Sequence, residues 1–260
     1  MADALNESEV RQRLTTRTIG ADYRHLSVTH STQDDVSTAG REGAAEGLTI
    51  TADEQTRGRG RFRRSWMSPP GASLLVSILL RPNAELLPTL SMICALAIPR
   101  AISRVCPQLN PEIKWPNDIL IGGRKVCGIL VEVVRGESEE DQFAVAGIGV
   151  NVNWDTASIP EIADASTSLS RETGGDVSRV ELLCALLEEL DALYVHAREG
   201  GDVFAQWRSS LVNLGKRVNV SGSDDSFEGL ALDVEPSGAL VVQTDDGQHR
   251  VVHAGDVTLR

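Results

Sequence analysis

The sequence has 260 residues, 41% of them hydrophobic, and a formal net charge of −12; this length suits one large domain, or a large and a small one. Its isoelectric point near 4.9 argues against a general affinity for nucleic acids or anionic membranes. We therefore expect no nucleic-acid or membrane partner, and any bound anion must be held by a local basic cluster.

The beginning of the chain and its cysteines indicate the compartment. Residues 1–14 are polar and acidic, unlike a secretory or transit peptide, and residues 1–15 predict a short helix. The longest apolar stretch, 92–102, is too short to span a bilayer. Four separated cysteines without CxxC spacing favour reduced, buried thiols over zinc binding or disulfides. Together these features predict a cytoplasmic protein.

The first strand is predicted at residues 26–30. It leads into Ser31 and Thr32, where a hydroxyl can cap a helix that continues to about residue 46. Hydroxyls at such a junction can equally bind a polar ligand head, and these residues alone leave both interpretations open. A second strand is predicted at 48–52.

Residues 57–66, which we call the arginine loop, contain five arginines, two glycines and no acidic residue. Glycine lets the backbone approach a ligand closely, and guanidinium groups bind phosphate or carboxylate in bidentate fashion. A local anion is therefore expected, although a solvated basic loop and a nucleic-acid contact are the alternatives. The loop precedes a continuous apolar strand at 74–80, so we expect it to extend from a rigid sheet.

The middle of the chain predicts a helix and a hairpin. Residues 86–105 have helical apolar spacing with a kink near Pro99, and a glycine pair at 122–123 joins two strands. Lys114 and Lys125 flank this hairpin, and each taken alone is expected on the surface. The strand at 143–152 contains Gly147 and Gly149, which indicate a bulge or a ligand close to the backbone.

The last third changes character after an amphipathic helix at 180–199 and a second helix at 203–211. Short alternating strands at 217–220, 227–234, 239–244, 249–253 and 257–259 predict a small all-β barrel of SH3 size. The sequence has no phosphate-loop motif, zinc-protease motif or nucleophile elbow, so covalent catalysis by the enzyme is not indicated.

Five motifs occur in a specific order. They are His30-Ser31-Thr32, Gln55 with Gly58-Arg59-Gly60-Arg61, Lys114-Trp115-Pro116-Asn117-Asp118, Lys125 with Gly128-Ile129-Leu130, and Gly147-Ile148-Gly149-Val150-Asn151. This set resembles the biotin protein ligases, also called holocarboxylase synthetases, over residues 25–155. The resemblance implies an α/β (α+β) fold: a mixed-sheet catalytic domain at 1–214, related to class II synthetase and lipoate ligase folds, and an SH3-like β barrel at 215–260.

The resemblance also implies an activity. A biotin protein ligase uses ATP, Mg²⁺ and biotin to make biotinyl-5′-AMP, then transfers biotin to a lysine on the biotin carboxyl carrier domain of acetyl-CoA carboxylase or a related acyl-CoA carboxylase. A lipoate or octanoate ligase is the nearest alternative, and a non-enzymatic nucleotide- or nucleic-acid-binding module is another. The Gly-Arg-Gly-Arg and Lys-Trp-Pro-Asn-Asp motifs favour biotin. Both a monomer and a homodimer are consistent with the sequence.

Residue roles follow from the matched motifs. The catalytic residues implied are Lys125, Arg61 and Asp118. The biotin-binding residues implied are Ser31, Thr32, Gln55, Gly58, Arg59, Arg61, Lys125, Gly128, Leu130 and Gly149. The nucleotide-binding residues implied are Arg61, Trp66, Asn117, Lys125 and Asn151, with the Trp66 ring on adenine. The motifs leave the metal ligands unknown; Asn117 and Asp118 would organise the loop and the phosphate or metal side.

The chain departs from the family pattern at three positions. Gln33 stands where Asn is usual, Arg57 replaces a small residue, and Arg63 replaces a glycine of the loop. A side chain at Arg63 disfavours a positive φ, so we expect the loop to fold differently. Members that repress transcription carry an N-terminal winged helix-turn-helix, for which this chain lacks the length, so a ligase without DNA-binding function is expected.

Overall fold

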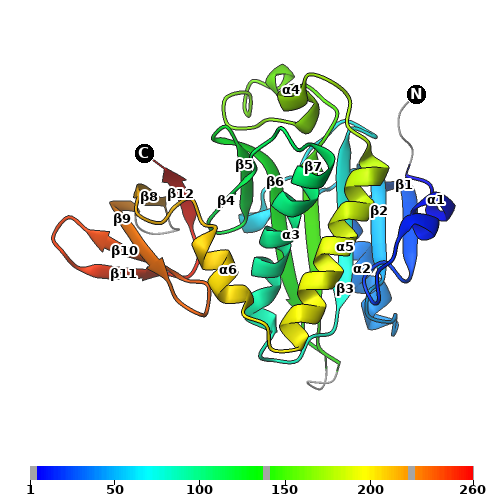
Figure 1. Cartoon of the computed structure of the whole chain (residues 1–260), viewed down its shortest axis with the longest axis horizontal. Coiled ribbons are helices and arrows are strands. Elements are labelled where there is room, and N and C mark those ends of the chain that lie inside the picture. The colour runs from blue at the N-terminus through cyan, green and yellow to red at the C-terminus, as the bar shows by residue number, and fades with distance from the viewer. Residues whose placement is uncertain (1–4, 137–140, 222–225, 260) are drawn as a thin grey trace.

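The computed structural model describes residues 5–136, 141–221 and 226–259, and is built around a seven-stranded mixed sheet (Figure 1). The strand order is β1-β2-β3-β7-β6-β5-β4, with β1 and β2 parallel and all other neighbours antiparallel. The strands are β1 Tyr23–Thr29, β2 Thr49–Gln55, β3 Ser73–Leu80, β4 Glu112–Lys114, β5 Asp118–Ile121, β6 Arg124–Val134 and β7 Phe143–Asn151.

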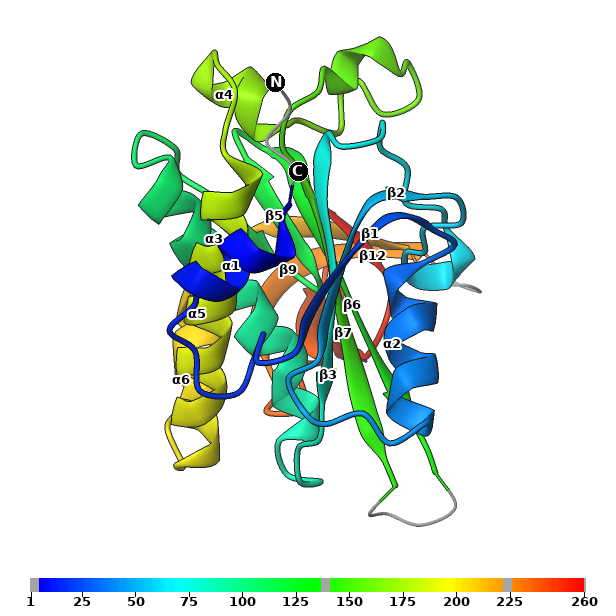
Figure 2. The same cartoon turned by 90° about the vertical axis from the view of Figure 1, so that its right-hand side faces the viewer.

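Helices cover the two faces of this sheet unequally (Figure 2). Helices α3 (Leu90–Val105) and α5 (Arg179–Arg198) pack together on one face, with α1 (Glu7–Arg13) beside β1 and α6 (Val203–Ser209) against α3. Helix α2 (Thr32–Arg41) packs alone on the other face, against β2, β3 and β7. The α2 face is therefore the face with room for a ligand.

The residues of β7 explain this difference between the faces. Side chains alternate along a strand, and its even-numbered residues 144–150 join the core under α3 and α5. On the α2 face, Phe143 and Val145 pack in a second, smaller core, and then Gly147 and Gly149 present no side chain. A trough in the sheet surface results.

The C-terminal domain is a five-stranded antiparallel sheet of order β11-β10-β9-β8-β12, which lies on the β4 and β5 side of the large sheet (Figure 1). Its strands are β8 Arg217–Ser221, β9 Ser226–Val234, β10 Leu240–Thr244, β11 His249–Val252 and β12 Asp256–Leu259. The expected fold class, a mixed α/β domain followed by a small all-β domain, is confirmed.

Three local expectations need correction. Helix α2 ends at Arg41, earlier than expected, because Gly43 takes a left-handed conformation that turns the chain away. No bulge interrupts β7 at its glycines, since its pairing with β3 and β6 keeps a constant register. Helix α3 begins at Leu90, later than the expected start at residue 86, because a 3₁₀ turn at Leu87–Thr89 precedes it.

Candidate active site

A cavity of about 410 Å³ lies in the trough on the α2 face. Its walls come from the start of α2, the end of β2, the arginine loop, β3, β6, β7, residues 114–118 and strand β12 of the C-terminal domain. The predicted site residues that line it are Ser31, Thr32, Gln55, Arg59, Arg61, Trp66, Asn117, Asp118, Lys125, Gly128, Leu130 and Gly149. Segments far apart in the sequence therefore meet around one space.

The floor of the cavity is made by glycines that other side chains cover. An ideal Cβ added to Gly149 would lie 2.6 Å from the Trp66 ring, and one added to Gly128 would lie 2.8 Å from the same ring. A Cβ added to Gly147 would lie 2.8 Å from the Gln33 amide. Any larger residue at these positions would push the covering side chains away, so the sequence needs glycine here for close approach to the backbone.

The arginine loop lies over this floor and folds on itself. The Trp66 N–H donates to the Gly58 carbonyl at 2.9 Å, and the Gly60 N–H donates to the Arg64 carbonyl at 2.7 Å. Between them Arg61–Arg63 forms a 3₁₀ turn in which Phe62 and Arg63 have φ of 55° and 59°. The expectation that the side chain at Arg63 excludes a positive φ is therefore wrong: two non-glycine residues accept this strained conformation in succession.

Three arginines of the loop reach acceptors across the cavity, which argues against a freely solvated loop. Arg59 Nη2 lies 2.9 Å from Asp34 Oδ1 on α2 and 2.9 Å from Glu132 Oε2 on β6. Arg61 Nη1 donates to Asn117 Oδ1 at 3.0 Å. Arg64 forms an ion pair with Asp256 at the start of β12. In contrast, Arg57 and Arg63 are exposed and contribute no lining.

Arg61 is the most enclosed of these arginines. Burial lowers the pKa of its guanidinium, while the nearby carboxylates of Asp256 and Asp118 oppose the shift. An arginine remains protonated despite such a shift. Arg61 is therefore a partly desolvated cation at the mouth of the cavity, where its attraction for an anion is stronger than in water.

Lys125, at the beginning of β6, is paired with a carboxylate. Its Nζ lies 2.6 Å from Asp118 Oδ1 and 5.7 Å from the centre of the Trp66 ring. Lys114 Nζ approaches the other oxygen of Asp118 at 3.9 Å. Taken alone, each lysine is expected on the surface, but neither is a free surface residue. Two ammonium groups and one carboxylate converge at this end of the cavity.

A polar network beside the cavity holds the backbone of Lys125. The Lys125 N–H donates to the Ala165 carbonyl, and its carbonyl accepts from the Thr167 N–H, both at 2.8 Å. Thr167 Oγ1 and Arg124 Nη2 both donate to the Glu172 carboxylate at the end of the short helix α4 (Leu169–Thr173). The network therefore fixes the strand from which the Lys125 side chain extends.

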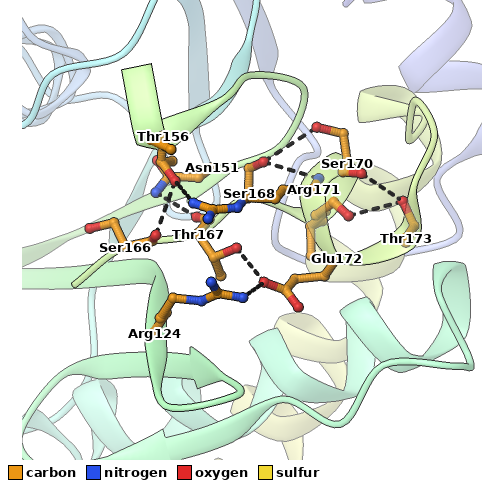
Figure 3. A network of polar contacts seen from close by, with 12 residues as sticks. Arg124, Asn151, Thr156, Ser166, Thr167, Ser168, Ser170, Arg171, Glu172 and Thr173 are labelled. Atoms are coloured by element: carbon orange, nitrogen blue, oxygen red, sulfur yellow. Dashed lines mark hydrogen bonds and ion pairs between the residues drawn. The ribbon is translucent and has the colours of Figure 1, made fainter. Parts of the chain in front are cut away.

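Sequence reasoning missed this network, because residues 152–178 have no periodic apolar pattern. Their structure is a 3₁₀ turn at Thr156–Ser158 and helix α4, tied together by hydroxyl groups (Figure 3). One such tie is Ser168 Oγ, which donates to the Trp154 carbonyl at 2.6 Å. The density of Ser and Thr in 166–173 is the signal that could have indicated a hydrogen-bonded support.

The opposite end of the cavity is lined with hydroxyl and amide groups. Ser31 is the N-cap residue of α2, yet its side chain makes no capping hydrogen bond, and its buried Oγ has no partner among the described residues. Thr32 donates from both its backbone N–H and its Oγ1 to Gln55 Oε1, at 2.8 and 3.0 Å. Of the two interpretations of Ser31, capping by the side chain is therefore wrong.

Two predicted site residues do not line the cavity. Gly58 is buried within the arginine loop, where an added Cβ would come 2.4 Å from the Trp66 carbonyl oxygen. Asn151 lies two residues after Gly149 on β7 and donates to the Thr167 carbonyl at 3.0 Å (Figure 3). Its Oδ1 is buried and has no hydrogen-bond partner within the part of the chain that the structure describes.

The remaining reactive groups lie outside this site. All four cysteines are free and buried, as predicted, and burial raises the pKa of Cys94 to about 12. Among the described residues, no three His, Cys, Asp or Glu side chains are grouped so that they could hold a metal ion. None of the described helices has the length and apolar character needed to cross a membrane.

Comparison with known proteins identifies the two parts of the chain. Residues 26–151 match the biotin/lipoate A/B protein ligase family, and residues 214–260 match the biotin protein ligase C-terminal domain. The bifunctional ligase/repressor BirA of Bacillus spizizenii is 33% identical over 98% of this chain and 79% of its own length. The biotin–[acetyl-CoA-carboxylase] ligase of Mycobacterium tuberculosis is 32% identical over 92% of this chain and 90% of its own.

Solved structures give the same result. The biotin protein ligase from Aquifex aeolicus, in complex with biotin and ATP, superimposes with a TM-score of 0.77 at 28% identity, covering 92% of this chain and 99% of the Aquifex chain. Both the sequence matches and the structural match extend over the large sheet and the C-terminal domain. The chain belongs to the biotin protein ligase family.

Proposed function

We propose that this chain attaches biotin to a lysine of a biotin carboxyl carrier domain in an acyl-CoA carboxylase, by an ATP-dependent reaction through biotinyl-5′-AMP. One observation carries the proposal: three arginines of the loop and two lysines surround a cavity whose glycine floor lets a ligand reach the sheet. The relatives named as biotin ligases, and the C-terminal domain match, favour biotin over lipoate or octanoate.

The first step joins two anions. A carboxylate oxygen of biotin attacks the α-phosphorus of ATP, the bond from that phosphorus to the bridging oxygen of the β-phosphate breaks, and pyrophosphate leaves. Lys125 and Arg61 supply the positive charge that offsets the repulsion and stabilises charge on the transferring phosphoryl group. Asp118, 2.6 Å from the Lys125 ammonium, holds that group in place until the substrates bind.

The second step transfers the acyl group. The neutral ε-amine of the carrier lysine attacks the carbonyl carbon, the bond from carbon to the phosphate oxygen breaks, AMP leaves, and the amine loses a proton. Water competes with the amine for the same carbon. The arginine loop lies over the cavity and excludes water, which is the main contribution that an already activated intermediate requires.

Each ligand has its own part of the cavity. We assign the biotin rings to Ser31, Thr32 and Gln55, and the adenine to the face of Trp66. Asn151 does not line the cavity, but its buried Oδ1 has no hydrogen-bond partner among the described residues, and we propose that it accepts from the adenine amino group. Gly58 would serve the fold of the loop.

Mg²⁺ would enter with ATP. Two carboxylates line the cavity and both are paired with a cation, Asp118 with Lys125 and Asp256 with Arg64; the described residues form no group of three His, Cys, Asp or Glu side chains suited to a metal ion. Among the described residues there is thus no dedicated magnesium site, and we propose that Mg²⁺ is coordinated mainly by phosphate and water, in keeping with its preference for oxygen ligands. We further propose a catalytic domain at 1–214, a C-terminal domain at 215–260, and a cytoplasmic location.

The test is biotin-dependent exchange of radiolabelled pyrophosphate into ATP by the purified protein, with lipoate and octanoate in parallel reactions. Exchange with biotin alone is expected. Exchange with only lipoate or octanoate would show that the protein is a lipoate or octanoate ligase instead. No exchange with any of the three acids would refute adenylation. Transfer of labelled biotin to a purified carrier domain then tests the second step.

A further inference from the structure

Gln33, in the first turn of α2, is a polar side chain that the assigned roles leave unexplained. It lines the cavity, and only 4% of its surface is exposed. Its amide lies over Gly147, on the same face of β7 as Gly149. Gln33 therefore covers one end of the glycine floor, and Trp66 covers the other.

The orientation of this amide is fixed by its neighbours. Gln33 Nε2 donates to Glu132 Oε2 at 3.0 Å and lies 3.3 Å from the Leu130 carbonyl oxygen. A flipped amide would place its oxygen against these two acceptors and repel both. Oε1 must therefore face away from Glu132 and Leu130.

This Oε1 is an acceptor without a donor. It is buried and has no hydrogen-bond partner in the described parts of the chain, and it would lie 2.8 Å from a Cβ added to Gly147. Buried acceptors in folded proteins are nearly always paired, so a partner from outside the chain is expected. Ser31 Oγ, at the start of the same helix, is also buried and unpartnered.

We propose that Gln33 is a specificity-determining residue whose Oε1 accepts a hydrogen bond from a ring N–H of the bound acid. The cyclic urea of biotin has two N–H donors and one carbonyl acceptor. One N–H matches Gln33 Oε1, and the carbonyl oxygen matches the Ser31 hydroxyl. The dithiolane of lipoate and the alkyl end of octanoate have no N–H, and would leave Oε1 unpaired. The inference rests on the proposed function and explains how the site rejects the competing acids.

Glu132 is the positioning residue for this contact. Its Oε2 accepts from Gln33 Nε2 and from Arg59 Nη2, and Arg59 also contacts Asp34, the neighbour of Gln33. The arginine loop and the acceptor over Gly147 are therefore tied to one carboxylate. Removing that carboxylate frees the amide to rotate and lose its orientation.

The experiment compares biotin with its two carbamate analogues, in each of which one ureido N–H is replaced by oxygen. For the native protein, we expect one analogue to need about tenfold more ligand for half-saturation in pyrophosphate exchange than the other. Gln33→Met keeps the volume but removes the acceptor. This substitution should raise the biotin concentration needed for half-saturation about tenfold and leave that of the weaker analogue unchanged. The ratio of half-saturating concentrations between octanoate and biotin should therefore become smaller.

The controls separate the possible failures. Gln248→Met, at an exposed turn of the C-terminal domain, should behave as the native protein. Glu132→Ala should weaken the binding of biotin but not the binding of the weaker analogue. Glu132→Gln keeps an acceptor for the Gln33 amide and should bind biotin with native affinity. Equal half-saturation by the two analogues in the native protein overturns the proposal without any variant. If the native protein fails to exchange with biotin, it is the proposed function that fails.

Discussion

The floor of the cavity and the arginine loop above it are held by different kinds of contact. The floor belongs to strands β3, β6 and β7, which pair in continuous register, and the backbone of Lys125 makes two hydrogen bonds to the segment 165–167. The loop is held mainly by arginine side chains, of which Arg59 is 40% and Arg64 is 66% exposed. Exposed ion pairs of this kind stabilise by only about 0–1 kcal/mol each.

This difference suggests separate roles: the floor with Lys125 serves the chemical step, and the arginine loop encloses the ligands. The Lys125 ammonium group, which we propose acts on phosphate, is already held by Asp118, so little free energy should be lost in ordering it during the reaction. The loop, with weak ties and two strained residues, can open to admit biotin and ATP and close over them. Substitutions in the floor should therefore alter the chemical step, whereas substitutions in the loop should alter binding and release.

The largest effect is expected from Lys125→Ala. A neutral side chain cannot stabilise the phosphoryl charge, so the rate of adenylate formation should fall about 10²- to 10³-fold while the fold persists. Single-turnover formation of biotinyl-5′-AMP measures this rate, and circular dichroism checks the fold. Lys216→Ala, at an exposed lysine, is the matched control. A native rate in the Lys125 variant would remove this lysine from the mechanism.

Arg61→Gly should act on retention of the intermediate. Loss of a partly desolvated guanidinium at the cavity mouth should raise the dissociation rate of biotinyl-5′-AMP about tenfold, a loss of about 1.4 kcal/mol, and allow stray acylation of nearby lysines. Stopped-flow dissociation and mass spectrometry of bystander proteins measure the two effects. Arg57→Gly, outside the cavity lining, should show neither; unchanged dissociation in the Arg61 variant would contradict the role.

Arg63→Gly should stabilise the folded loop. Glycine accepts φ near 59° without the steric cost of about 1 kcal/mol or more that a side chain carries there. Cleavage by chymotrypsin at Phe62 should slow by up to about fivefold. At Arg57, where the backbone is not left-handed, glycine should only add freedom and speed cleavage. Faster cleavage in both variants would show that strain does not limit this loop.

The smallest effect is expected between Arg64 and Asp256. A double-mutant cycle replaces each residue by Ala and then both, and measures the ATP concentration needed for half-saturation. The coupling free energy between the two residues should be about 0.2–1 kcal/mol. Raising the salt concentration should reduce this coupling. Strict additivity of the two single substitutions would mean that the C-terminal domain does not hold the loop.

The sequence predicts the floor better than its surroundings. The continuous apolar run at 74–80 and the glycines at 147 and 149 mark buried strands and a close approach, because both signals lie within one element. The support of Lys125 could not be predicted, since residues 152–178 fold against a strand without a pattern of their own. The contact of Arg64 with Asp256 joins residues 192 positions apart, and no local signal specifies it.

The place of Asp256 and Thr258 in the cavity wall bears on how this enzyme can be recombined. A module that merely follows a catalytic domain can be exchanged between relatives at its linker. Here strand β12 completes the cavity wall, and its Asp256 forms an ion pair with Arg64 of the arginine loop. A chimera joined near residue 214 would take these two residues from different parent proteins. Exchanging Arg64 and Asp256 as a pair should recover the small loss of ATP binding, about 0.2–1 kcal/mol, that such a hybrid would show.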